Sequence, residues 1–242
     1  MKNSSLETNP QLYARLAGAL YLAVIALGIF AEAYVLNHFR SAADVASLAQ
    51  NILAEPILWN LGTFANLLLV LCATALSWLL YLLLRPVNRN LMLLAAFFNI
   101  VSLAVETLSK LFQLMVKPIL TSTSMAKAFE PGQLHALANF ALRSHDIAFN
   151  VALIFFGAAC ILYGHLIFKS GYLPKFVGVL MQIGGLSYLI ACFAALFAPA
   201  LSNLINPAIL ALPLLGEASL CLWLLVKGVN LSKWNDLQRS QS

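Results

Sequence analysis

Charged side chains are scarce in this sequence. Asp, Glu, Lys and Arg make up 10% of the 242 residues, whereas hydrophobic residues make up 62%. Soluble domains carry about 25% charged residues, so this chain has too few to cover a soluble surface. Three stretches without any of the four are each long enough to cross a bilayer, which takes about 20 apolar residues: residues 56–84, 147–168 and 176–216. Because these runs also lack the alternation of a membrane barrel, we expect helices that span a membrane.

Several motifs that would indicate a specific chemistry are absent. There is no CxxC pair, and the four cysteines lie in apolar runs, where single cysteines usually pack as small apolar groups: Cys72, Cys160, Cys192 and Cys221. There is no HExxH, P-loop, GxSxG or GxGxxG motif. Carboxylates and one imidazole could serve as metal ligands, namely Glu32, Glu106, His145 and Glu217. No ligand spacing supports such a site, so we assign neither a metal nor a cofactor.

Charges and prolines divide the chain into six expected spans. They cover roughly residues 12–36, 56–84, 91–118, 147–168, 176–198 and 207–226. The first ends at Ala31-Glu32-Ala33, which has the form of a signal cleavage site, but the acid within it favours a retained span. A short amphipathic helix should follow it, with Ser41 as N-cap. The prediction is an all-α, polytopic six-helix bundle (residues 12–227) with short amphipathic helices in its outer loops and tails at 1–11 and 228–242.

Lysine and arginine near the span ends predict the orientation. If the N-terminus is cytoplasmic, the inner side carries nine of the fourteen basic residues: Lys2, Arg15, Arg85, Arg89, Lys169, Lys175, Lys227, Lys233 and Arg239. The positive-inside rule therefore favours cytoplasmic N- and C-termini. This distribution also explains the net charge of +5 without a nucleic-acid partner; the bilayer is the partner that we expect.

Polar residues of several spans should share one level in the membrane. A helix rises 1.5 Å per residue, so depth can be counted from each inner basic residue. Glu32, Glu106, Asn66 and Asn150 then lie about 25–28 Å up. His145 and Asp146 lie at about 34–36 Å, near the outer limit of a hydrocarbon core of about 30 Å. Glu217 is the deepest acid, at about 15 Å.

Two interpretations of these residues compete. Glu106 and Lys110 are four residues apart, and Asp146 lies one turn from Arg143 and Asn150; such charges near the membrane surface often only neutralise each other. Glu32 and Glu217 have no basic residue within one turn. A buried carboxylate is costly, so each should be protonated or find a partner on another helix. For Glu217 the alternative is a neutral carboxyl bonded to carbonyls freed by Pro213.

Three blocks of sequence resemble a known family. They are RPVNRNLMLLAAFF (85–98), FFGAACILYGHLIFKSGYLPKFVGVL (155–180) and GEASLCLWLLVKGV (216–229). Together they resemble the integral-membrane family catalogued as domain of unknown function 4386, over about residues 15–229. The resemblance implies a polytopic helical protein of bacterial plasma membranes. It also implies an acid near the end of the first span and a Gly-Glu pair in the last, which Glu32 and Gly216-Glu217 match.

Three functions remain open. The first is binding or transport of a small amphipathic or cationic ligand in an outward-facing acidic pocket, where Glu217 would exchange a proton or cation; a transporter this small would require a homodimer. Candidate ligand-binding residues are Glu32, Asn66, Glu106, Lys110, His145, Asp146, Asn150 and Glu217. The second is an enzyme that uses buried carboxyls for acid–base chemistry on a lipid or isoprenoid. The third is a structural or regulatory membrane protein whose polar residues join helices.

Overall fold

Helices make up the secondary structure of the residues that the structure, a computed structural model, describes: 9–205 and 208–239. Within these ranges six helices are long and apolar enough to cross a membrane. They are Pro10–Arg40, Pro56–Leu84, Arg89–Thr121, Pro131–Ser170, Lys175–Phe197 and Ile209–Val226. The predicted all-α bundle with six spans is therefore confirmed.

The first span is continuous but changes its helical form. It consists of α1 (Pro10–Gly28), the π-helix η2 (Ile29–Leu36) and α2 (Asn37–Arg40). The other spans are α4 (Pro56–Leu84), α5 (Arg89–Thr121), α7 (Pro131–Ser170), α8 (Lys175–Phe197) and α10 (Ala208–Val226). Four short helices complete the described chain: α3 (Val45–Ala54), α6 (Thr123–Ala128), α9 (Pro199–Ile205) and α11 (Leu231–Arg239).

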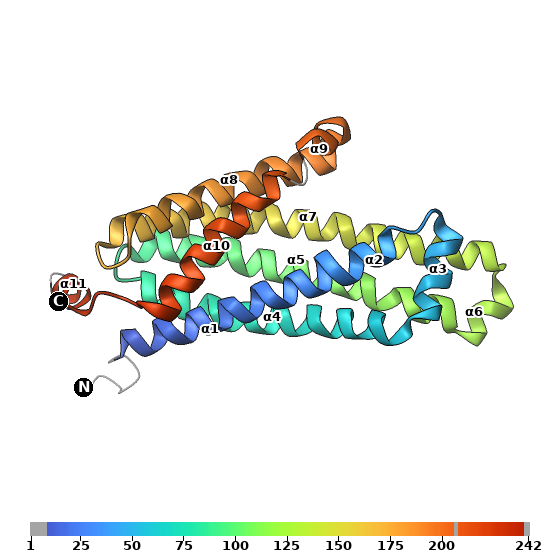
Figure 1. Cartoon of the computed structure of the whole chain (residues 1–242), viewed down its shortest axis with the longest axis horizontal. Coiled ribbons are helices and arrows are strands. Elements are labelled where there is room, and N and C mark those ends of the chain that lie inside the picture. Colours follow the sequence, from blue (N-terminus) through green and yellow to red (C-terminus); the bar gives the residue numbers. More distant parts are fainter. Residues whose placement is uncertain (1–8, 206–207, 240–242) are drawn as a thin grey trace.

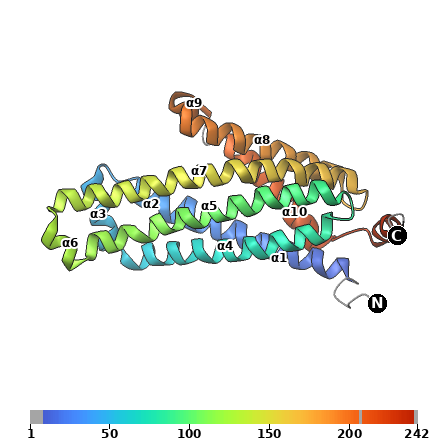
Figure 2. The same cartoon turned by 180° about the vertical axis from the view of Figure 1, so that it is seen from behind.

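The spans form a bundle of unequal lengths (Figures 1 and 2). Helices α3 and α6 lie at one end, and the start of α1 lies at the opposite end with α11 (Figure 1). Both ends of the described chain are thus on one side of the bundle. Helix α7 has 40 residues and is about 60 Å long, twice the thickness of a hydrocarbon core of about 30 Å. Helix α7 is therefore longer than one crossing requires.

Local sequence signals explain most helix ends. Proline begins α1, α4 and α7, where its missing N–H costs nothing. The N-cap of α3 is Asp44, which accepts a hydrogen bond from Ser47 N at 2.7 Å. That bond lowers the pKa of Asp44 because it stabilises the carboxylate. The prediction of Ser41 as this cap is wrong, since its own N–H bonds to Asn37 O and closes α2.

Glycine allows three pairs of spans to approach closely. A Cβ on Gly164 would lie 2.5 Å from Gly178 O, and one on Gly185 would lie 2.5 Å from Gly157 O. These pairs join α7 to α8. In the same way, Gly216 brings α10 against Leu180 of α8, and Gly18 brings α1 against Leu225 of α10. Because lipid tails are as apolar as leucine, small residues that permit close backbone packing drive helix association in membranes.

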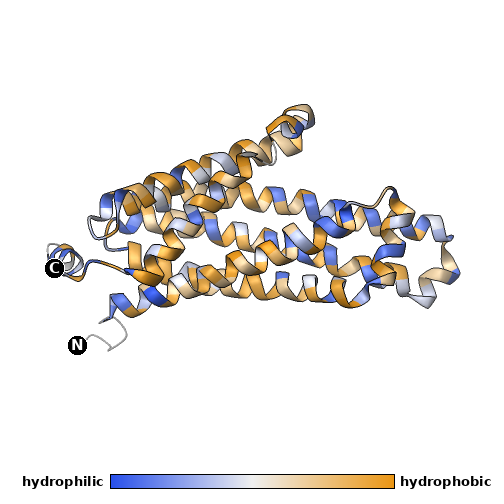
Figure 3. Cartoon of the chain, viewed as in Figure 1, coloured by the Kyte–Doolittle hydropathy of each residue, from blue (hydrophilic) through white to orange (hydrophobic). Residues whose placement is uncertain are grey.

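The outer surface of the bundle is mostly apolar (Figure 3). Large side chains such as Leu71, Phe64 and Phe97 are 69%, 64% and 60% exposed, as suits contact with lipid rather than water. At the end with both termini, the turn between α7 and α8 supports α11. Tyr172 contacts Trp234 at a ring distance of 4.9 Å and donates a hydrogen bond to Leu83 O at 2.5 Å. Residues 231–239, assigned to a C-terminal tail, therefore form a docked helix.

Candidate functional site

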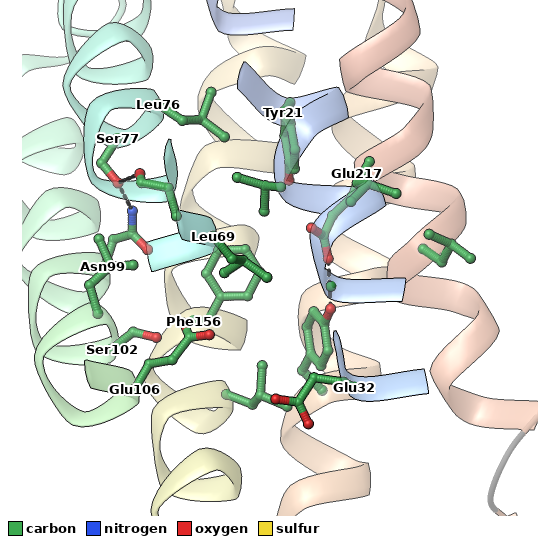
Figure 4. Close-up of a pocket in the computed structure, with 18 of the residues that line it drawn as sticks. Tyr21, Glu32, Leu69, Leu76, Ser77, Asn99, Ser102, Glu106, Phe156 and Glu217 are labelled. Carbon is green, nitrogen blue, oxygen red and sulfur yellow. Dashed lines mark hydrogen bonds between the residues drawn. The ribbon is translucent and has the colours of Figure 1, made fainter. Parts of the chain in front are cut away.

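A cavity of about 230 Å³ lies inside the bundle, and all six spans contribute to its wall. Most of its lining is apolar, including Leu76, Leu80, Leu153 and Phe156. Its polar lining residues are Tyr21, Glu32, Ser77, Asn99, Ser102, Glu106, Tyr163, Tyr188 and Glu217. Figure 4 shows Glu32 and Glu106 toward one end of this cavity, with Glu217 beside Tyr21 further along. Three carboxyl groups thus face one small and largely apolar space.

Glu32 is placed by the π-helical turn of the first span. Its carboxylate lies 2.8 Å from Lys110 Nζ, 3.7 Å from His145 Nε2 and 4.0 Å from Arg40 Nη1. The expectation that Glu32 finds a partner on another helix therefore holds. Short π-helical turns are rare and often occur at functional sites. Here the turn lies between α1, which lines the cavity, and α2, which carries Arg40.

Lys110 is the most deeply buried cation of the described chain, at 0% exposure. Its Nζ contacts Glu32, lies 3.8 Å from Glu106 Oε1 and lies 4.4 Å from the centre of the Phe149 ring. The predicted pair four residues apart on α5 is thus present, but the nearer carboxylate comes from η2. A buried lysine is tolerated only with such compensation, so Lys110 links the first span to α5.

His145 lies behind Glu32 and does not line the cavity. It is fully buried, and its Nδ1 lies 3.0 Å from Ser109 O on α5. The ring stacks on Phe149, with centres 5.9 Å apart. These contacts hold Nε2 toward the Glu32 carboxylate.

A second hollow of about 360 Å³ lies outside this charged layer, between the segment after the first span and α7. Arg40 and Asp146 both line it, and Arg40 Nη2 donates a hydrogen bond to Asp146 Oδ1. The sequence had suggested Arg143, one turn away, as the partner of Asp146. Arg40 also approaches Glu32, so one guanidinium connects the outer hollow with the carboxylates of the inner cavity.

Four predicted site residues line neither hollow: Lys110 and His145, which contact Glu32, and Asn66 and Asn150, which do not. Asn150 Nδ2 donates to Asp146 O, one turn back on the same helix, at 2.9 Å. Asn66 Nδ2 donates to Gln113 Oε1 at 3.0 Å, and both side chains are fully buried. Asn66 therefore joins α4 to α5. Of the eight candidates, the structure brings together Glu32, Glu106, Lys110, His145 and Asp146, and places Glu217 deeper in the same cavity.

Glu217 is held by a phenol rather than by backbone carbonyls near Pro213. Tyr188 O–H donates to Glu217 Oε1 at 2.7 Å, and Tyr21 lies beside the carboxyl in the cavity wall (Figure 4). Gly216 and Gly18 make this possible because they bring α10 close to α8 and α1. Within the described residues, Glu217 forms no ion pair. It is the one cavity carboxyl there without a cationic side chain beside it.

Sequence reasoning missed the neutral polar residues of the cavity. Asn99 Nδ2 donates to Ser77 Oγ at 2.5 Å, and the buried Tyr163 hydroxyl has no hydrogen-bond partner among the described residues. The signal was available: Asn99 lies ten residues beyond Arg89, which is about 15 Å and the level of Glu217. As for metals, the described residues contain no group of three or more His, Cys, Asp or Glu side chains arranged around one ion.

These features define a polytopic α-helical membrane protein with a charged internal cavity. Its sequence matches the family described as "Domain of unknown function (DUF4386)" over residues 16–228, and the chain belongs to that family. It is also 30% identical, over 166 residues, to an "Uncharacterized protein" of Archaeoglobus fulgidus, which covers 69% of this chain and 83% of that protein. No solved structure matches the chain.

Proposed function

We propose that this protein binds a small amphipathic cation in the membrane cavity and carries it across the plasma membrane. The termini are cytoplasmic in this proposal, so the hollow at Arg40 and Asp146 faces outward, and a homodimer is the transporting unit. The observation that carries the proposal is the cavity itself, where Glu32, Glu106 and Glu217 face an otherwise mostly apolar wall.

Charge favours a cationic ligand over an anionic or neutral one. Lys110 is shared between Glu32 and Glu106, and Glu217 has only phenolic partners in the described chain. The carboxyl groups on the wall therefore outnumber the cations that contact them. An ammonium group at Glu217 or Glu106 would supply the missing positive charge, which a low-dielectric site makes valuable. The aromatic rings of Tyr21, Tyr188 and Phe156 can add cation–π attraction.

Size and lining favour a ligand with a short apolar body. Pockets for drug-sized molecules are about 300–1,000 Å³, whereas this cavity is about 230 Å³. Leucine and phenylalanine side chains form the wall between the two groups of carboxyls. We therefore expect an amine of roughly one ring or a short chain rather than an intact phospholipid.

The binding test compares two probes of nearly the same shape but different charge, 2-phenylethylammonium and 2-phenylethanol. Calorimetry on detergent-purified protein should show saturable binding of the ammonium, and Glu217→Gln should weaken it roughly tenfold, which corresponds to about 1.4 kcal/mol. The matched control is Glu55→Gln, which removes an exposed carboxylate paired with His38 outside the cavity.

Equal binding of the two probes, or unchanged affinity in Glu217→Gln, would contradict a cation site at this carboxyl. Binding that depends on Glu217 predicts uptake of radiolabelled 2-phenylethylammonium into proteoliposomes, and its absence would remove the transport step while leaving binding intact.

A further inference from the structure

The hydroxyl of Tyr163 is a buried hydrogen-bond donor that the protein itself does not use. Tyr163 lies on α7 and lines the inner cavity, and the residue is 1% exposed. Its hydroxyl makes no hydrogen bond within the described residues. Asn99 on α5 is its polar neighbour, but the two groups do not meet the geometry of a hydrogen bond. Because buried hydroxyls in folded proteins nearly always have a partner, this one suits a partner that enters the cavity.

The serine hydroxyls on the same side of the cavity are already in use. Ser77 Oγ donates to Ala73 O at 2.7 Å, and Ser102 Oγ donates to Ala152 O at 2.8 Å. A hydroxyl has one proton to donate, so neither serine has one left for a ligand. Among the described residues, Tyr163 is thus the lining residue on α4, α5 and α7 with a free O–H.

Ser77 also fixes the orientation of the Asn99 amide. Because its own proton goes to Ala73, Ser77 Oγ can only accept from the amide, and Asn99 Nδ2 donates to it at 2.5 Å. The amide oxygen, Asn99 Oδ1, accepts no hydrogen bond from a described residue. A free donor on Tyr163 and a free acceptor on Asn99 are therefore neighbours. This pair matches a hydroxyl group, which can accept one hydrogen bond and donate another.

Asn99 lies across the cavity from Glu217. Figure 4 shows Asn99 and its partner Ser77 on one side and Glu217 on the other, with Leu69 and Phe156 between them in this view. The first side is formed by α4, α5 and α7, and Glu217 comes from α10. A ligand that reaches both sides therefore needs a different polar group at each end of an apolar body.

We propose that Tyr163 and Asn99 form a subsite that selects amines with a hydroxyl group at the end opposite the ammonium. The ligand hydroxyl accepts a hydrogen bond from Tyr163 O–H and donates one to Asn99 Oδ1, while the ammonium lies at Glu217. An analogue without the hydroxyl leaves both buried groups unpaired, and sites of this kind discriminate strongly against such analogues. The position of the ammonium rests on the proposed function, whereas the free donor and acceptor do not.

Three ammonium probes that differ at one ring position test this subsite: 2-phenylethylammonium, its 4-hydroxy derivative and its 4-methyl derivative. Calorimetry on detergent-purified protein should show that the 4-hydroxy probe binds roughly tenfold more tightly than the other two. The methyl group is similar in size to the hydroxyl, so it separates hydrogen bonding from filling of space. In Tyr163→Phe the 4-hydroxy probe should bind no more tightly than 2-phenylethylammonium.

A measurement without ligand tests whether the Tyr163 hydroxyl is unused within the protein. Tyr163→Phe should unfold at the temperature of the wild type or above it, since it removes a buried polar group that has no partner. The matched control is Tyr172→Phe, whose lost hydroxyl donates to Leu83 O, so this variant should unfold at a lower temperature. Equal losses in the two variants would reveal a partner for Tyr163 within the protein and overturn the proposal.

Failure of the subsite can be told apart from failure of the proposed function. Equal affinity of all three probes, with binding that depends on Glu217, would overturn the subsite and leave the cation site intact. A preference for the 4-hydroxy probe that persists in Tyr163→Phe would place the hydroxyl elsewhere and also overturn the subsite. No binding of any probe would overturn the proposed function and the subsite with it.

Discussion

Lys110 illustrates how single residues in this protein bury charge. The side chain has no exposed surface, yet its Nζ is within 4 Å of two carboxylates and faces the Phe149 ring. Each carboxylate comes from a different part of the chain, η2 and α5. The lysine is therefore stabilised by the folded arrangement of two spans, and the two acids depend on it in turn.

Removing this cation should destabilise the protein strongly. Lys110→Met leaves Glu32 and Glu106 without their shared partner, and breaking a buried ion pair costs about 3–5 kcal/mol. We expect this loss in the free energy of unfolding, measured by denaturant titration in detergent. The double variant Lys110→Met/Glu32→Gln should recover part of it, because it also removes one unpaired charge. Lys127→Met on exposed α6 is the control, and a loss below about 1 kcal/mol at position 110 would contradict this account.

At the scale of elements, the pair α7–α8 shows why some glycines cannot be replaced. The two contacts, Gly157 with Gly185 and Gly164 with Gly178, are seven residues apart on each antiparallel helix. Backbone atoms, which cannot rotate away, occupy the space where a methyl group would go. These contacts set the distance between the helices that carry Phe156 and Tyr188, two residues of the cavity wall.

Gly164→Ala should therefore separate α7 from α8. Forcing a methyl group into a packed contact costs about 1–3 kcal/mol, and we expect thermal unfolding in detergent to occur at lower temperature. Gly132→Ala on the same helix is the matched control, since a Cβ there meets nothing within 4 Å; alanine should be neutral or slightly stabilising at that site. Equal stability of the two variants would show that the close contact is absent.

The whole molecule is asymmetric along its long axis. Helices α3 and α6 lie at one end, and α11 and the start of α1 lie at the opposite end (Figure 1). The turn between α4 and α5 and the turn between α7 and α8 have two basic residues each, Arg85 with Arg89 and Lys169 with Lys175. The positive-inside rule therefore predicts that these turns and both termini are cytoplasmic.

Cysteine labelling of intact cells tests this orientation. A membrane-impermeant maleimide should label Ser124→Cys on α6 and spare Ser232→Cys on α11, both of which replace exposed residues. Permeabilised cells should show label at both sites. The wild-type chain measures background from its own four cysteines. Label only at position 232 in intact cells would reverse the orientation, and would place the hollow at Arg40 and Asp146 inside the cell.

Several features of this protein follow from the sequence alone. The six spans and the even number of crossings follow from the length of apolar runs and the position of charges, because the bilayer imposes its thickness on any chain. The limits follow less well: the fourth span was expected from residue 147, but its helix begins at Pro131. Helical rise also put Glu32 and Glu106 at one level. The lack of a local cation correctly indicated that Glu32 needs a partner from another helix.

Tertiary structure alone decided which polar groups meet. Asp146 bonds to Arg40, more than a hundred residues away, instead of Arg143 one turn away, because the rotation of each helix about its axis depends on packing. The phenols at Glu217 are set by the glycine contacts of α10 with α8 and α1. The depth of a residue in the membrane can be counted along its own helix. Which side chains of two helices face each other depends on how the helices pack, so only the tertiary structure determines it.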